Sequence, residues 1–464
     1  MTAQVSFLDG TLSLIHIPLD LYSSLLQPIL KILLPPSQNP SQRATGGWTV
    51  QDHSHGFLNI SVTPIECSIV CNSAWASSVF EPAIRRLPAH QARTVAISRD
   101  TYVALNVYGT DMDAGSRVAE LTSPLALANI PIFFITTYYS DFILVPTKDR
   151  EAVVKTLLAR NFVFSDDDQS RLVSANPSPT SAVHHHHYHH HCRAPPPSDP
   201  EPQPGRPGAS SSSSSTTADI VADLQQRTFD LLRRRHVRPR IEPGLVLVQC
   251  SGIRGAVTPS VHPARARRGS GGSGGGGGGS GSGAGGGGGP SWVDTVDTRL
   301  YTGIVAALAA QPRFLSVTLA QDDPPSLLLD KALLRMFGSA LVGPIGEGWR
   351  PAGEAESGGE GEEEKVGKAQ EAGGEALVPI FLDLADLPFE ATGIVSGVAG
   401  RLVRELNAAA GSGESGVGIG LGAELSYLST ARAGAVILGR EQAAVALGVL
   451  KPLLAGEEGS EDPR

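Results

Sequence analysis

The sequence predicts an α+β protein made of a repeated βαββαβ unit. Three observations predict this class. Apolar residues alternate with period two in short runs and follow the helical period in longer runs. The same order of runs recurs along the chain, and tracts rich in Gly, Pro, Ser or Glu separate the copies. We therefore expect several small domains rather than one large core.

The N-terminal half contains two copies of the unit. The first has a strand at 12–17, a helix at 19–34, strands at 57–63 and 67–71, and a helix at 75–87. The second has a strand at 102–107, a helix at 115–128, strands at 132–135 and 142–145, a helix at 149–160 and a last strand at 161–164. Period-two runs broken by turn residues predict the strands, and apolar residues spaced three and four apart predict the helices.

The C-terminal half repeats this order with insertions. The third copy has a strand at 245–248, a helix at 298–310, strands at 314–319 and 327–329, and the start of a helix at 333–337. The fourth has a strand at 378–384, a helix at 393–410, strands at 425–428 and 435–438, and a helix at 441–454. Residues 135–137 read Ile-Thr-Thr and residues 428–430 read Leu-Ser-Thr. In both cases four residues separate the triplet from the next apolar strand. This shared spacing predicts an internal duplication.

These patterns divide the chain into modules and linkers. The predicted modules are 10–88, 89–164, 227–340 with a Gly/Ser insertion at 265–290, and 377–456. Between them we expect a disordered His/Pro/Ser linker at 165–226 and a disordered Gly/Glu linker at 341–376. Such compositions bury too little apolar surface to order themselves.

Composition argues against several classes of partner. The formal net charge is −9, and the arginine cluster at 233–240 has no interleaved aromatic residues, so we expect no nucleic-acid binding. No apolar run approaches the roughly 20 residues of a membrane helix. The four cysteines form no paired CxxC units, which is typical of reduced thiols. We therefore expect a cytosolic, cytoplasmic protein that is not inserted in a membrane.

Catalytic and cofactor motifs are not found in the sequence. The glycine-rich run at 393–400 matches neither GxGxxG nor GxxxxGK[ST], and no GxSxG or HExxH pattern lies in a catalytic context, so we expect neither enzymatic activity nor a cofactor. The histidine run at 184–191, followed by Cys192, could chelate a metal. A flexible run has no fixed geometry, so we interpret it as a low-complexity expansion and expect no metal site.

The second hairpin carries a family resemblance. The run from Ile135 to Val145 reads ITTYYSDFILV and is similar to a strand-turn-strand motif of the CASTOR arginine sensors. Residues 14–34 and 393–395 also resemble that family, in a divergent, fungal-type form. The resemblance implies four ferredoxin-like ACT modules in two tandems, with an amino acid bound between the second and fourth. It also implies a GATOR-like partner complex in target-of-rapamycin signalling.

The resemblance also implies site residues. The positions matching the family's ligand site are Pro131, Ile132, Phe389, Glu390, Thr430, Ala431 and Gly434. Gly434 stands where the family has a ligand-binding acid, and Pro131 replaces a serine. Without a carboxylate for the guanidinium group, arginine loses its best contact, so we expect another small amino acid as ligand.

The resemblance also implies residues that bind a protein partner. Tyr138, Tyr139 and Asp141 match positions through which the family binds its protein partner. Exposed tyrosines frequently anchor such surfaces, although hydroxyls and a carboxylate are also ordinary turn chemistry. A homodimer is a further option. The alternative function is a regulatory ACT subunit that controls an amino-acid biosynthetic enzyme.

Overall fold

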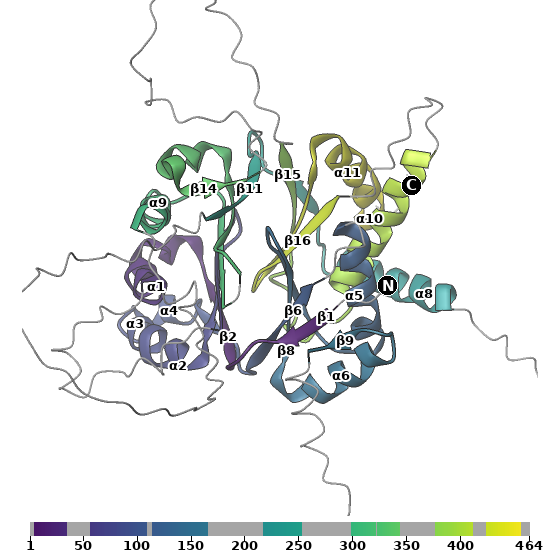
Figure 1. Ribbon diagram of the computed structural model, residues 1–464, viewed down its shortest axis with the longest axis horizontal. Helices are drawn as coiled ribbons and strands as arrows, with labels where there is room; N and C mark the ends of the chain where they lie inside the picture. The colour runs from purple at the N-terminus through teal and green to yellow at the C-terminus, as the bar shows by residue number, and fades with distance from the viewer. Residues whose placement is uncertain are drawn as a thin grey trace, which may run out of the picture.

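A computed structural model of the 464-residue chain describes residues 4–34, 56–108, 114–165, 217–252, 298–321, 323–343, 376–411 and 424–455. Within these residues, twelve strands form a closed ring of sheet. The ring is flattened into two sheets that face each other, and helices cover both outer sides (Figure 1). The observed helix and strand content confirms the predicted α+β class.

Each of the two sheets combines strands from both halves of the chain. The first sheet runs in the order β2 (Leu12–Ile17), β4 (Cys67–Asn72), β3 (Phe57–Val62), β12 (Leu315–Ala320), β13 (Ser326–Asp330), β11 (Leu247–Gly252). The second runs β6 (Tyr102–Tyr108), β8 (Asp141–Pro146), β7 (Phe133–Thr136), β16 (Leu425–Ser429), β17 (Ala433–Gly439), β15 (Leu377–Asp383). Single residue pairs, Leu12 with Tyr102 and Leu247 with Leu377, join the two sheets at the corners.

Short strands extend the edges of the sheets. The first sheet carries β5 (Ala96–Ile97) and β14 (Leu341–Val342). The second carries β1 (Gln4–Phe7), β9 (Val163–Phe164) and β10 (Pro239–Ile241). All described pairings are antiparallel except the parallel pair of β1 with β9.

Helices bury the outer face of each sheet (Figure 1). The first sheet is covered by α1 (Leu26–Leu33), α2 (Ser73–Trp75), α3 (Glu81–Ile84), α4 (Ala89–Ala92) and α9 (Thr298–Ala309). The second is covered by α5 (Ala114–Leu127), α6 (Arg150–Leu158), α8 (Thr217–Arg234), α10 (Ile394–Gly411) and α11 (Arg440–Leu454). Short 3-10 helices lie at Leu19–Leu21, Ser23–Leu25, Thr147–Asp149, Lys331–Met336 and Gly338–Ala340, and a π-helical turn lies at Ala76–Phe80.

The core has three apolar layers. One lies under each helical layer, and the third lies between the two sheets. In this central layer Phe57 packs against Phe142 with ring centroids 4.9 Å apart, and Phe314 packs against Phe381 at 6.0 Å. Strands covered on both faces need apolar residues on both faces, which explains the nearly continuous apolar runs of the sequence.

Two segments lie elsewhere than the sequence predicted. Strand β1 precedes the predicted first module at residue 10 and pairs with β6 and β9 in the second sheet. Helix α8 begins at Thr217, inside the linker predicted at 165–226, and buries Leu224 and Phe229. A Ser/Thr-rich run comes directly before the apolar residues of α8. For this reason the composition of the whole stretch predicted a disordered linker.

The predicted third module, 227–340, also includes residues that pack with the second sheet. Strand β10 lies within it but pairs with β15. The predicted Gly/Ser insertion at 265–290, most of the predicted Gly/Glu linker at 341–376, and the histidine run lie outside the described residues. No helix in the described part of the chain is both long and apolar enough to cross a membrane.

Candidate functional site

A cavity of about 50 Å³ lies at the turn end of β16 and β17, where β7 and the amino end of α10 converge. Its lining consists of Ile132, Phe133, Leu384, Leu387, Pro388, Phe389, Ala391, Gly393, Ile394, Val395, Tyr427, Ser429, Thr430, Ala431 and Ala433. One water molecule needs about 10 to 15 Å³ on this scale, so the cavity has room for a small ligand group.

Most side chains that line the cavity are apolar, and polar atoms form much of the rest of its surface. None of its lining residues carries a carboxylate or an ammonium group. Gly393 precedes α10 in a left-handed conformation, with φ of +81°, which a residue with a side chain rarely adopts. The first N–H groups of a helix have no acceptor inside the helix, so the amino end of α10 presents donors and a partial positive charge to the cavity.

The turn at Thr430 forms one wall of the cavity. The Thr430 N–H donates to Ala433 O at 2.8 Å, and the Ala433 N–H donates to Thr430 Oγ1 at 3.1 Å. The β7–β8 turn repeats this at Thr137, whose N–H donates to Ser140 O at 2.9 Å while Ser140 N–H donates to Thr137 Oγ1 at 3.3 Å. Threonine closes the turn in both hairpins because its side-chain oxygen accepts a backbone bond within the loop.

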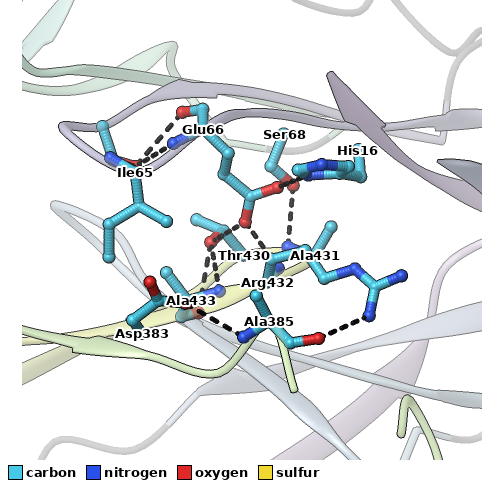
Figure 2. Close-up of polar contacts among 11 residues, drawn as sticks. His16, Ile65, Glu66, Ser68, Asp383, Ala385, Thr430, Ala431, Arg432 and Ala433 are labelled. Atoms are coloured by element: carbon cyan, nitrogen blue, oxygen red, sulfur yellow. Dashed lines mark hydrogen bonds and ion pairs between the residues drawn. The ribbon is translucent and has the colours of Figure 1, made fainter. Parts of the chain in front are cut away.

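A buried carboxylate holds the Thr430 turn in place from the opposite sheet (Figure 2). Glu66, at the β3–β4 turn, is fully buried. Its carboxylate accepts hydrogen bonds from Thr430 Oγ1 at 2.6 Å and from the Arg432 N–H at 2.5 Å, and it lies 2.5 Å from His16 Nδ1. The Ala431 N–H donates to Ser68 Oγ at 3.0 Å. These contacts fix the cavity wall to the first sheet.

A positive charge lies beside the cavity. The Arg432 guanidinium donates to Ala385 O at 3.1 Å and lies over the Phe389 ring, 4.6 Å from its centroid. Phe389 also packs against Phe133, with centroids 6.5 Å apart. The guanidinium therefore ties the 384–391 loop to the Thr430 turn, and its charge opposes binding of a cationic ligand.

Gly434 and Tyr427 share the space behind the Thr430 turn. A Cβ at Gly434 would lie 2.6 Å from Tyr427 Oη, so an acidic side chain at this position would displace the tyrosine. The tyrosine hydroxyl is buried and has no hydrogen-bond partner. Burial raises the pKa of Tyr427, so the hydroxyl keeps its proton.

Four of the predicted ligand residues lie together in the cavity wall. They are Ile132, Phe389, Thr430 and Ala431. Pro131, Glu390 and Gly434 are not among the lining residues, and Glu390 is exposed. Whether the lining residues bind a ligand stays a prediction.

The predicted partner residues separate into exposed and buried ones. Tyr139 is 55% exposed and Tyr138 half-buried, with their rings in a T-shaped contact at 4.7 Å. Asp141 is only 2% exposed, and Arg117 Nε donates to its Oδ2 at 2.9 Å. Strand β8 turns the Asp141 side chain toward α5, and a role of Asp141 in partner binding stays a prediction.

Sequence reasoning missed Glu66, Arg432 and Tyr427. Glu66 follows a Thr-Pro-Ile turn and resembles ordinary turn chemistry, and Tyr427 occupies an ordinary strand position. A signal for Tyr427 exists in the predicted duplication, because the residue three positions before the turn threonine is Phe134 in one hairpin and Tyr427 in the other.

The described residues also show what metal and thiol chemistry is available. Within the described residues, no three of the His, Cys, Asp and Glu side chains gather closely enough to hold a metal ion. Cys67, Cys71 and Cys250 are buried free thiols. Burial raises the pKa of Cys71 and of Cys250 to about 12, so neither is a reactive thiolate at neutral pH.

Comparison with known proteins identifies one domain. Residues 97–159 match the family model described as an ACT domain. They form an ACT domain. It spans β6, α5, β7, β8 and α6, and it supplies Ile132 and Phe133 to the cavity wall. No curated protein matches the sequence.

Several solved structures align at low similarity, and three are compared with this chain as follows. They are a protein from Agobacterium tumefaciens (18% identity, TM-score 0.22, 41% of this chain and 99% of that chain), aspartate kinase from Synechocystis (8%, 0.26, 99% and 57%), and the ligand-free regulatory subunit of aspartate kinase from Thermus thermophilus (13%, 0.20, 34% and 96%). TM-scores this low do not establish a shared overall arrangement. None of these comparisons names the CASTOR family or indicates a fungal source.

Proposed function

We propose that this chain is a non-catalytic regulatory protein that binds a small amino acid in the cavity between β7, α10 and the Thr430 turn. The observation that carries the proposal is that an ACT domain, at residues 97–159, supplies one wall of a cavity whose lining side chains are mostly apolar. ACT domains commonly bind small amino-acid ligands. A concave apolar site with a few convergent polar groups is the usual form of a ligand site.

The proposal extends to four ACT-type modules in two tandems. Four stretches of the chain repeat the order strand, helix, strand, strand, namely β2-α1-β3-β4, β6-α5-β7-β8, β11-α9-β12-β13 and β15-α10-β16-β17. Strands β7 and β16 meet at Ile135 and Leu428 across an approximate two-fold. Phe134 N–H donates to Ser429 Oγ, and Tyr427 N–H donates to Thr136 Oγ1, both at 3.0 Å. The two bonds join equivalent positions of the two hairpins in opposite directions, which supports duplication.

The cavity favours an uncharged side chain on the ligand. A ligand carboxylate would find donors at the amino end of α10. A guanidinium group would find no carboxylate in the lining and would lie near Arg432. Each charge-assisted bond that is lost costs about 1.5 to 3 kcal/mol, so we propose weak arginine binding.

The protein partner is proposed on the family resemblance alone. A member of the CASTOR family would bind a GATOR-like complex in target-of-rapamycin signalling, and the exposed Tyr139 is compatible with such a contact. The alternative, a regulatory ACT subunit of a biosynthetic enzyme, predicts a different set of partners. Co-purification from the source cell separates them, since one recovers signalling-complex subunits and the other a metabolic enzyme.

Thermal melting of the full chain with each of the twenty amino acids tests ligand binding. A ligand specific to the folded state raises the melting temperature as RT ln(1 + [L]/Kd). Ala391→Phe fills the cavity and should abolish the shift, whereas Ala385→Phe, at an exposed position of the same loop, should retain it. If no amino acid shifts the wild-type protein, or if Ala391→Phe shifts as far as wild type, the proposed site is wrong.

A further inference from the structure

The buried hydroxyl of Tyr427 has no role in the folded protein that the structure describes. The residue is 1% exposed, and its Oη has no hydrogen-bond partner. An unsatisfied buried donor is unfavourable, and most buried polar groups in folded proteins are paired. A phenylalanine would therefore serve packing at least as well.

The direction of the side chain connects this hydroxyl to the cavity. Tyr427 pairs with Val436, but its hydroxyl is the atom nearest to where a Cβ on Gly434 would lie, and Gly434 is two positions closer to the turn. The ring therefore leans toward the turn end of the hairpin, where Ser429 and Thr430 line the cavity that Tyr427 itself lines. Gly434 makes this possible, because a side chain there would collide with the hydroxyl.

The equivalent position in the other hairpin shows what packing alone requires. Phe134 pairs with Ile143 as Tyr427 pairs with Val436, three residues before the turn threonine in each case. Phe134 is fully buried and carries no hydroxyl. At this position the hairpin whose turn forms the cavity wall therefore carries a tyrosine hydroxyl, and the other hairpin carries none.

We propose that Tyr427 Oη donates a hydrogen bond to the ligand in the cavity and that the ligand is a small amino acid with an uncharged side chain. This inference rests on the proposed function. The hydroxyl is protonated, and the amino end of α10 and Arg432 are also donors, so the polar surroundings select an acceptor. A carboxylate is the strong acceptor that every amino acid carries.

Removal of the hydroxyl alone tests the proposal. Tyr427→Phe should weaken binding of the tightest binder among L-alanine, L-serine, L-valine and L-leucine by about tenfold or more. Its melting temperature without ligand should equal or exceed that of wild type, because an unsatisfied group has been removed.

Tyr22→Phe is the matched control. Tyr22 is also buried, but its hydroxyl donates to Leu308 O at 2.8 Å on the other side of the molecule. This variant should melt at a lower temperature and keep wild-type affinity. Tyr427→Phe should therefore lower affinity without lowering the melting temperature, and Tyr22→Phe should lower the melting temperature without lowering affinity. A purely structural role for Tyr427 would not produce this contrast.

Three results overturn the proposal. If Tyr427→Phe binds as tightly as wild type, or if it destabilises the unliganded protein as Tyr22→Phe does, the hydroxyl is not a ligand contact, while amino-acid binding stands. If L-arginine binds wild type more tightly than the four uncharged probes, the ligand class is wrong. If none of the probes binds wild type, the proposed function fails and this proposal falls with it.

Discussion

The turn ends of the β7–β8 and β16–β17 hairpins share a backbone but differ in what fills the space beside them. Thr136 pairs with Asp141 in one, and Ser429 pairs with Gly434 in the other. Asp141 accepts from Arg117, so a charged pair occupies the first position. At the second, glycine leaves room for the Tyr427 hydroxyl, and a cavity lies next to it. The two hairpins thus carry different side chains at this equivalent pair of positions.

The two turns also dock differently on the first sheet. The Thr430 turn bonds to the fully buried Glu66. In the other turn, the Tyr138 N–H donates to Ser326 Oγ at 2.9 Å and Ser140 Oγ donates to Asp323, while Tyr139 stays exposed. The first arrangement holds a cavity wall rigidly, and the second presents side chains outward. Similar local structure therefore supports different roles.

The largest effect is expected at Glu66. Glu66→Ala removes the acceptor for Thr430 Oγ1 and the Arg432 N–H and leaves both buried, which should cost about 3 to 5 kcal/mol of unfolding free energy. Asp323→Ala, the corresponding change at the other turn, should cost about 1 kcal/mol because Asp323 is half-buried. Urea denaturation measures both. Equal costs would remove the contrast between the turns.

Breaking the Arg117–Asp141 pair beside the β7–β8 turn should have the next largest effect. Arg117→Met leaves the Asp141 carboxylate buried without its cation and should cost about 2 to 3 kcal/mol at pH 7. Burial already raises the pKa of Asp141, and Arg117 lowers it, so the variant raises it further. The folded state then holds a proton that the unfolded state has lost above about pH 4.

The cost of Arg117→Met should therefore grow as pH rises through the raised pKa of Asp141. Urea denaturation at pH 4.5 and at pH 7, values chosen to bracket the onset of this window, measures the difference. Asp141→Asn in the same background should flatten the dependence. A cost of Arg117→Met that does not change with pH would show that the pair does not titrate as described.

Removal of the Thr430 or the Thr137 hydroxyl should have a smaller effect on stability, and the size of this effect should differ between the two hairpins. Thr430→Val loses the bonds to Glu66 and Ala433 and should cost about 2 kcal/mol, whereas Thr137→Val loses only the local turn bonds and should cost about 1 kcal/mol. Thermal melting of the two variants compares them directly. If Thr137→Val proves the more damaging, the account of the docking contacts is wrong.

The smallest effect on stability is expected at the exposed turn. Replacing both Tyr138 and Tyr139 by Ala should cost about 1 kcal/mol or less, since the Tyr138 bond to Ser326 uses its backbone N–H. If this turn anchors a partner, the same variant should lose that partner in a pull-down. A variant that melts normally and recovers the same partners would exclude the turn as an anchor.

Local patterns predicted much of the fold and part of the site. Apolar periodicity predicted the strands of both hairpins, and turn chemistry predicted Thr137 and Thr430 as equivalent, because both signals act within a few residues. The contact between Glu66 and Thr430 spans 364 positions, so no local pattern could predict it. The burial of Asp141 likewise depends on α5, which places Arg117 beside the strand, so the residues next to Asp141 in the sequence could not predict it.

Calorimetric titration of the full chain tests the central claim most directly, because it measures ligand class and stoichiometry together. We predict one site per chain for a small uncharged amino acid, because Asp141, paired with Arg117, occupies in the other hairpin the position that Gly434 occupies beside the Tyr427 hydroxyl. Loss of that site in Ala391→Phe would locate it at the cavity. Low-micromolar, arginine-selective binding, or two equal sites per chain, would contradict the account.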